Sequence, residues 1–340
     1  MRKLLLFFLM YFGISVFSQK IMLEPLLQDE ISIRAILVDE GKIIYSSTNS
    51  TFGILDYSQT IHQKKIKISD KKLQFRTLAQ DRSNYYTINI EQPAYFFKID
   101  KKTLESVVVF TDFQEKSFYD ALIYDAGKFY TFSDPEKDGK LKFISFQMGD
   151  DNFQLENIGN NAPKMIDGEA AFAASNTNIA FSSKYIWLAT GGQVSRIWRY
   201  QKNKNKWEVF STPFVQGKSS QGMYSIDFLD NNFGVAVGGD YTNQAANENN
   251  IAITKNGGKT WKIVASGKNE GYMTCVKIRP NTNGREMIAV GDNHISYSKN
   301  FGNSWTKLSD EKGLYVCEWI DENTLAFAGK GKILKGKLIE

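Results

Sequence analysis

Four acidic residues stand beside short apolar or glycine-rich runs, at the ends of predicted strands. They are Asp134, Glu169, Asp240 and Asp292. A pair of carboxylates is what glycoside hydrolysis requires, one as the acid and the other as the nucleophile or base. An aspartate near glycine also caps a turn by accepting backbone N–H groups. Both interpretations stay open: Glu169, Asp240 and Asp134 are candidates for catalysis, but no complete catalytic set is visible and we assign no catalytic residue.

Three long predicted loops lie near these acids and contain or adjoin aromatic residues. They cover residues 158–168, 211–222 and 241–250. Loops of this length on a rigid scaffold commonly carry binding sites. Acids beside aromatic rings suit a polar ligand with flat faces, such as a sugar or an exposed peptide. The predicted ligand- or partner-binding residues are Asp120, Asp134, Glu169, Arg196, Asp240, Tyr241 and Asp292.

Motifs for other chemistries are missing. The chain has two cysteines and two histidines, too few for a four-cysteine zinc site or a histidine-rich metal centre. No Gly-x-Gly-x-x-Gly follows a strand, and there is no Cys-x-x-Cys. We therefore expect no metal and no cofactor. Arg34 at a predicted strand start is followed by Ala-Ile, so the Arg-Ile-Pro signature of sialidases is absent. We do not predict an enzyme; if the chain is one, a glycoside hydrolase fits better than an oxidoreductase.

Strands must position these residues. Runs of four to eight β-branched and aromatic residues recur between clusters of Gly, Asn, Asp and Ser, for example at 31–38, 85–90 and 186–190. We find no stretch of a dozen residues with a convincing 3.6-residue period. The pattern predicts an all-β fold.

Two segments repeat the pattern Ser/Thr-x-Asn-x-Gly-x-Ser/Thr-Trp, with their tryptophans 44 residues apart. The Asn side chain can bond to nearby backbone, Gly permits a tight turn, and Trp packs beneath it. This pattern matches the Asp-box, or BNR repeat, with Asn in place of Asp. The residues that carry it are Thr254, Asn256, Gly258 and Trp261 in one copy and Ser298, Asn300, Gly302 and Trp305 in the other.

The repeat spacing predicts a propeller. About 322 residues at roughly 45 per blade gives about seven blades. We therefore predict an all-β, seven-bladed β-propeller with four-stranded antiparallel blades. The last blade is short by one strand, so we expect the N-terminal strand 20–27 to pair with 332–338 and close it. Cys275 and Cys317 fall at equivalent positions of neighbouring repeats, either as free buried thiols or as a disulfide.

The N-terminus predicts export. Met1-Arg2-Lys3 is followed by 13 uncharged, mostly apolar residues and a cleavage site near Ser18-Gln19. We expect residues 1–18 to be a signal peptide and 19–340 to form a single propeller domain. No cysteine adjoins the cleavage site, so lipid attachment is not expected there. The protein is predicted to be secreted or periplasmic.

The remaining charge excludes some partners. The net charge of +5 falls to about +3 without the signal peptide, which is too small to predict nucleic-acid binding. No later segment is apolar enough for membrane insertion. We expect a monomer.

Several short sequence segments together resemble those of a known family. They are Phe118-Tyr-Asp-Ala121, Ser133-Asp-Pro135, Gly168-Glu-Ala-Ala-Phe-Ala-Ala-Ser175 and Gly238-Gly-Asp-Tyr241, with the two Asp-box copies. The mature chain resembles secreted bacterial seven-bladed BNR/Asp-box propellers related to photosystem II stability/assembly factors, which often carry a loose oxidoreductase label. Where that family usually has Gly-Asp-Pro, this chain has Ser133-Asp-Pro135.

Two hypotheses about function follow. The resemblance implies a non-catalytic binding or scaffold propeller of the cell envelope, which we expect to dock a protein partner on the loop-rich face of blades 4 and 5. The alternative is a glycan-binding or glycoside-hydrolysing propeller that uses Glu169 with Asp240 or Asp134.

Overall fold

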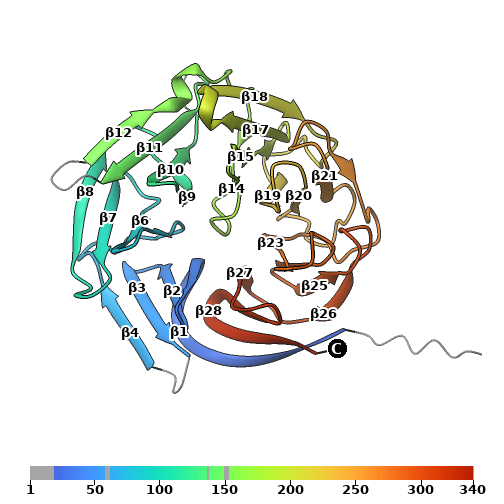
Figure 1. The fold of residues 1–340 in the computed structure, drawn as a ribbon, viewed down its shortest axis with the longest axis horizontal. Helices are drawn as coiled ribbons and strands as arrows, with labels where there is room; N and C mark the ends of the chain where they lie inside the picture. Colours follow the sequence, from blue (N-terminus) through green and yellow to red (C-terminus); the bar gives the residue numbers. More distant parts are fainter. Residues whose placement is uncertain (1–18, 58–61, 136–137, 149–152, 340) are drawn as a thin grey trace, which may run out of the picture.

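The protein is a ring of antiparallel sheets around a central axis (Figure 1). The computed structural model describes residues 19–57, 62–135, 138–148 and 153–339. Within these residues the helices are two short 3-10 turns, η1 (Ile158–Asn161) and η2 (Lys202–Lys204), and none is long and apolar enough to cross a membrane. The predicted signal peptide, residues 1–18, lies outside the described residues.

The two chain ends share one six-stranded sheet, which we call the joint sheet. Its strand order is β27-β28-β1-β2-β3-β4. The bounds are β1 (Lys20–Asp39), β2 (Lys42–Ser47), β3 (Thr51–Asp56), β4 (His62–Lys67), β27 (Leu314–Trp319) and β28 (Thr324–Ile339). The N-terminal part of β1 pairs with the C-terminal part of β28, from Lys20 opposite Ile339 to Gln28 opposite Lys332. The ring is closed by this ladder.

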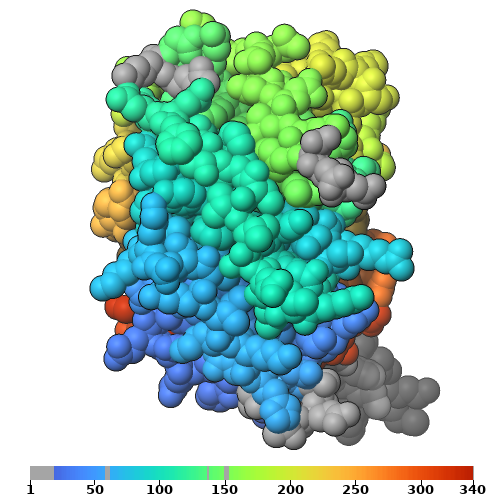
Figure 2. Space-filling view, turned by 90° about the vertical axis from the view of Figure 1, so that its left-hand side faces the viewer, coloured from blue at the N-terminus to red at the C-terminus, as the bar shows by residue number. Residues whose placement is uncertain are grey.

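The next two sheets follow the chain in order. One contains β5 (Ala79–Gln80), β6 (Asn84–Ile88), β7 (Ala94–Asp100) and β8 (Ser106–Asp112). The other contains β9 (Tyr119–Asp125), β10 (Lys128–Ser133), β11 (Lys142–Met148) and β12 (Phe153–Asn157). Seen from the side, the cyan and green residues of these two sheets lie above the blue residues of the joint sheet (Figure 2).

Three sheets complete the ring. The first contains β14 (Ile179–Phe181), β15 (Tyr185–Ala189), β17 (Arg196–Gln201) and β18 (Lys206–Ser211). The second contains β19 (Gln221–Phe228), β20 (Gly234–Asp240), β21 (Ile251–Thr254) and β22 (Lys262–Ile263), extended by the two-residue strands β13 (Glu169–Ala170) and β16 (Gly191–Gly192). The third contains β23 (Cys275–Ile278), β24 (Met287–Gly291), β25 (His294–Ser298) and β26 (Thr306–Ser309).

The prediction of seven four-stranded blades is wrong. The described strands form an all-β propeller of six blades, four with four strands and two with six. The repeat length counts the first and last units of the chain as separate blades. In the structure β1 pairs with β28 along one half and with β2 along the other, so a continuous hydrogen-bond ladder joins the two units into the joint sheet.

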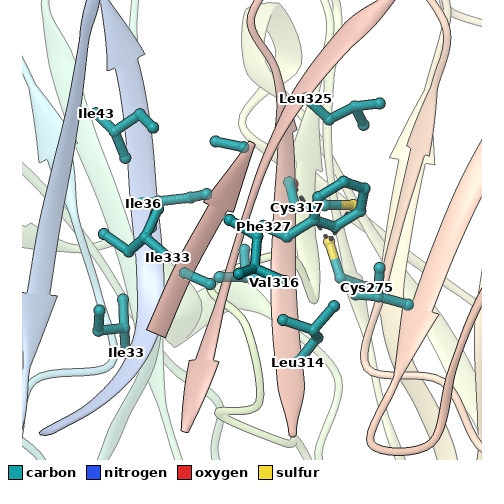
Figure 3. Packing of buried hydrophobic residues seen from close by; sticks show 14 of the residues in the cluster. Ile33, Ile36, Ile43, Cys275, Leu314, Val316, Cys317, Leu325, Phe327 and Ile333 are labelled. Carbon is teal, nitrogen blue, oxygen red and sulfur yellow. Dashed lines mark hydrogen bonds between the residues drawn. The ribbon is translucent and has the colours of Figure 1, made fainter. Parts of the chain in front are cut away.

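The core lies between neighbouring sheets. Apolar side chains alternate along the strands, and each sheet therefore presents one row to the sheet before it and one to the sheet after it. Figure 3 shows the cluster between the joint sheet and β23, where Val316 and Phe327 lie between Ile36 and the thiols of Cys275 and Cys317. These thiols are buried and free, with their sulfur atoms 3.8 Å apart.

Candidate functional site

A segment from the middle of the chain crosses the central axis. This hub segment, residues 170–178, precedes β14 and lies at the centre of the ring (Figure 1). The Asn176 amide donates to the carbonyls of Leu78 and Leu122 at 2.9 and 3.2 Å. Ser175 Oγ donates to the carbonyl of Thr274 at 2.6 Å. The hub segment is therefore bonded to innermost chain segments on several sides of the axis.

An axial cavity of about 530 Å³ lies above the hub segment, at the end where the innermost strands begin. Its walls come from five of the six sheets. The lining residues are Arg34, Arg76, Phe118, Asp134, residues 170–174 of the hub segment, Tyr224, Tyr241, Gln244, Tyr272, Thr274, Asp292 and Tyr315. A second cavity, of about 420 Å³, lies on the other side of the hub segment.

One wall of the axial cavity is a packed group of aromatic rings. Phe172 of the hub segment stacks on Tyr224 with ring centroids 4.0 Å apart and an interplanar angle of 7°. Tyr272 meets Tyr224 edge-on at 4.9 Å. Tyr241 is 50% exposed at the rim. Such rings offer flat apolar contact area whose conformation is already fixed before a ligand arrives.

Two arginines add positive charge to the lining of the cavity. Arg34 donates to the carbonyl of Ala174 at 3.0 Å and lies 4.0 Å from the ring centroid of Tyr315. Arg76 donates to the carbonyl of Ala173 at 3.4 Å. Neither guanidinium forms an ion pair with any residue that the structure describes. Burial, followed by repulsion from Arg34, lowers the pKa of Arg76 to about 10.

Asp120 and Asp134 form a carboxyl pair beside the cavity. Asp134 follows β10 and lines the cavity, and its N–H donates to the carbonyl of Phe118 at 3.3 Å. Asp120 lies on β9 and is 1% exposed, and neither of its carboxyl oxygens has a hydrogen-bond donor among the described residues. Burial, followed by repulsion from Asp134, raises the pKa of Asp120 well above its usual range. Burial also raises the pKa of Asp134.

Glu169 is enclosed by donors from its own surroundings. Its carboxylate accepts bonds from the Thr190 hydroxyl at 2.6 Å, the Trp198 indole at 2.9 Å and the backbone N–H of Ile166 at 3.1 Å. The Arg196 guanidinium forms a bidentate ion pair with it. The Glu169 side chain has no exposed area. This arrangement anchors the chain that enters the hub segment and leaves the carboxylate outside the cavity wall.

Asp240 and Asp292 differ in their surroundings. Asp240 accepts from the Thr242 N–H at 2.9 Å and hydroxyl at 2.6 Å, which is the geometry of a turn cap. Asp292 lines the cavity and accepts from the Gln244 amide at 3.3 Å. Of the seven predicted binding residues, Asp134, Tyr241 and Asp292 therefore line the axial cavity, whereas Asp120, on the strand next to β10, does not.

Arg76, Tyr272 and Tyr315 were missed by the sequence reasoning. A signal for the two tyrosines was present: each stands one or two residues after a glycine at the start of an innermost strand, as Tyr224 does. Because those starts converge on one end of the axis, a repeated tyrosine there indicates a shared aromatic wall. For Arg76 no pattern in the chain indicated that it would face Arg34.

The two repeated turns lie away from this cavity. They join β21 to β22 and β25 to β26, and share the same bonds. Gly258 N–H donates to Thr254 at 3.0 Å, and Gly302 N–H to Ser298 at 3.0 Å. The indoles of Trp261 and Trp305 donate to the glycine carbonyls, and the Asn256 and Asn300 side chains accept from the backbone within each turn. Trp261 is buried and Trp305 half-buried.

No group of three or more His, Cys, Asp or Glu side chains that could hold a metal ion occurs in the described part of the chain.

Comparison with known proteins relates the chain by fold. No family model matches it, and no curated protein does. A structure of YCF48 bound to D1 peptide has a TM-score of 0.67 at 12% identity, covering 94% of this chain and 97% of that one. YCF48 from Cyanidioschyzon merolae has a TM-score of 0.64 at 12% identity, with 93% and 98% covered. A catalytically inactive virginiamycin B lyase from Staphylococcus aureus, with quinupristin, has a TM-score of 0.68 at 14% identity, with 95% and 100% covered. The shared property is the β-propeller fold.

Proposed function

We propose that this propeller is a non-catalytic binding protein that holds a segment of a partner protein in its axial cavity. One observation carries the proposal: Arg34 and Arg76, without ion-pair partners among the described residues, line the same cavity of about 530 Å³ as the stacked aromatic rings. Guanidinium groups bind carboxylates through several parallel N–H donors, and aromatic rings cover the apolar parts of a peptide. The favoured ligand is an extended peptide with an acidic group.

The fold comparison agrees with this role, since YCF48 has been solved with a D1 peptide. In our proposal the protein acts in the cell envelope after export, as a monomer. The rim residue Tyr241 and the carboxylates Asp134 and Asp292 would contact the partner around the central peptide.

The hydrolytic alternative has less support. The predicted hydrolase used Glu169 with Asp240 or Asp134. Glu169 and Asp240 are each bonded to neighbouring side chains and do not line the cavity. Glycoside hydrolysis needs one carboxyl that protonates the leaving oxygen and another that faces the sugar ring. A glycan ligand is therefore an outcome for the experiment to reveal.

A peptide array and a glycan array, probed with the purified protein, test the proposal. We expect capture by acidic peptides, with a Kd at least tenfold weaker for Arg34→Gln and Arg76→Gln. Lys259→Gln is the matched control, because Lys259 is exposed on the turn between β21 and β22 and its loss removes the same charge. Capture by glycans alone, or equal peptide binding by all variants, would overturn the proposal.

A further inference from the structure

We infer that Asp120 is a specificity-determining residue of the axial cavity, because its carboxyl group and an anionic group of the ligand compete for Arg76. The inference rests on the proposed function and adds a residue-level consequence: binding of an anion is coupled to uptake of a proton. Asp120 acts through Arg76 and does not itself touch the ligand.

The backbone places Asp120 in an unusual position. In the β9–β10 ladder, Ala121 pairs with Phe132 and Tyr119 pairs with Ser133, so Asp120 is the extra residue of a β-bulge. A bulge re-aims one side chain and occurs often beside functional sites. Here it puts a carboxyl where no donor of the described residues reaches either oxygen. An ionised carboxylate is costly in such a place, and a protonated one much less so.

The charged groups around Asp120 come from several elements. Asp134, at the end of β10, repels it, and Arg76, in the segment before β5, attracts it. Lys116, before β9, acts on Asp134. Arg76 in turn is repelled by Arg34 of β1 and attracted by Asp120 and, more weakly, by Glu91 after β6 and by Tyr315 of β27. Arg76 is the cation that links the buried carboxyl to the cavity.

These charges, which act on one another without direct contact, define two states. In the empty cavity an ionised Asp120 is the carboxylate that most strongly neutralises Arg76. When an anion binds Arg76, the guanidinium interacts with two negative charges and stabilises an ionised Asp120 less. One carboxyl oxygen of the Asp120–Asp134 pair then takes up a proton from solvent. For a singly charged group such as a carboxylate, one proton enters with one anion and the net charge of the buried site does not change; for doubly charged sulfate the proton offsets one of the two charges. Linkage requires that affinity for the anion decrease as pH rises, by at most about tenfold per pH unit for one proton.

Titration calorimetry with sodium sulfate at constant ionic strength tests this, because sulfate does not change its charge between about pH 5 and pH 8. Runs in two buffers of different ionisation heat count the protons taken up. For the wild-type protein we expect weaker binding at higher pH, and uptake of up to one proton per sulfate. Asp120→Asn should bind sulfate with a nearly constant Kd from about pH 6 to pH 8 and without proton uptake. Arg76→Gln should lose binding at every pH.

A second variant keeps the inference testable if Asp120→Asn does not fold. Asp134→Asn removes the like charge beside Asp120, so its pH dependence should persist but shift to lower pH. The same pH dependence in Asp120→Asn as in the wild type would overturn the inference, and so would absence of sulfate binding by the wild type. Either result leaves the proposed function to its own test, since peptide capture with and without Arg34 and Arg76 is measured at one pH.

Discussion

Replacing Glu169 by glutamine separates a structural carboxylate from a ligand-binding one. The change keeps the shape but replaces one acceptor oxygen with an NH₂ group that faces donors. The Arg196 side chain, which is 14% exposed, loses its ion-pair partner. Thr190 and Trp198 both donate to Oε1, so if the amide oxygen keeps that place, the new NH₂ group faces the Ile166 N–H and the Arg196 guanidinium, which donate to Oε2. Removing one member of a buried ion pair typically costs about 3–5 kcal/mol.

Urea and thermal unfolding of the purified variants measure this cost. For a domain of this size we expect the melting temperature of Glu169→Gln to fall by about 4–7 °C. Glu24→Gln is the matched control, because Glu24 is 59% exposed in a 3.8 Å pair with Lys335 and its loss should cost under about 1 kcal/mol. The double variant Glu169→Gln with Arg196→Met should be less unstable than the sum of the single changes, because no unpaired buried charge remains.

A different result would refute this assignment. If Glu169→Gln kept the wild-type unfolding midpoint and lost peptide capture, its carboxylate would contact the ligand and the ion pair with Arg196 would have to open on binding.

Three further predictions follow from buried contacts. Leu27 is 8% exposed where β1 meets β28, so Leu27→Ala should lower the free energy of unfolding by about 2–4 kcal/mol in a denaturant titration. Met22 is 57% exposed on the same strand, and Met22→Ala should change that free energy by under about 0.5 kcal/mol. Burial acts to raise the pKa of Asp240, but hydrogen bonds led by Thr242 outweigh it and lower the pKa to about 2. Because this value lies below the unfolded value of about 3.9, the carboxylate stabilises the fold by about 1–2 kcal/mol above pH 4, and this stabilisation is lost as the pH falls toward 2. The unfolding curves of Asp240→Asn and the wild type should therefore differ at pH 7 and converge at pH 2. Trp261→Ala should cost about 3–5 kcal/mol, while the still-folded fraction captures peptides normally; lost capture there would place the binding face at the wrong end of the axis.

Strand content and the ring architecture could be predicted from sequence because they depend on local patterns. The period of two along strands and the repeated turns around Trp261 and Trp305 are visible in the chain itself. The number of blades was mispredicted because a repeat length says nothing about whether two units stay separate or share a ladder, as β1 and β28 do.

Local sequence patterns could bring three of the predicted binding residues to one end of the axis, but not the contacts around the others. Asp134, Tyr241 and Asp292 follow second strands, whose ends converge by topology on the end of the axis where the cavity lies. Glu169 was chosen for its place at a strand start, but the donors that enclose it come from Thr190 and Arg196, more than 20 residues away, at distances set by hairpin register. Such partners are not encoded in local spacing.

The hub segment also bears on how the chain reaches this structure. The bond from Arg34 to Ala174 spans 140 positions, that from Ser175 to Thr274 spans 99, and that from Asn176 to Leu78 spans 98. Contacts between residues so distant along the chain repay the entropy of loop closure only after most of the intervening sheets have formed. We therefore expect the centre of the ring to be completed late in folding, after the sheets around it.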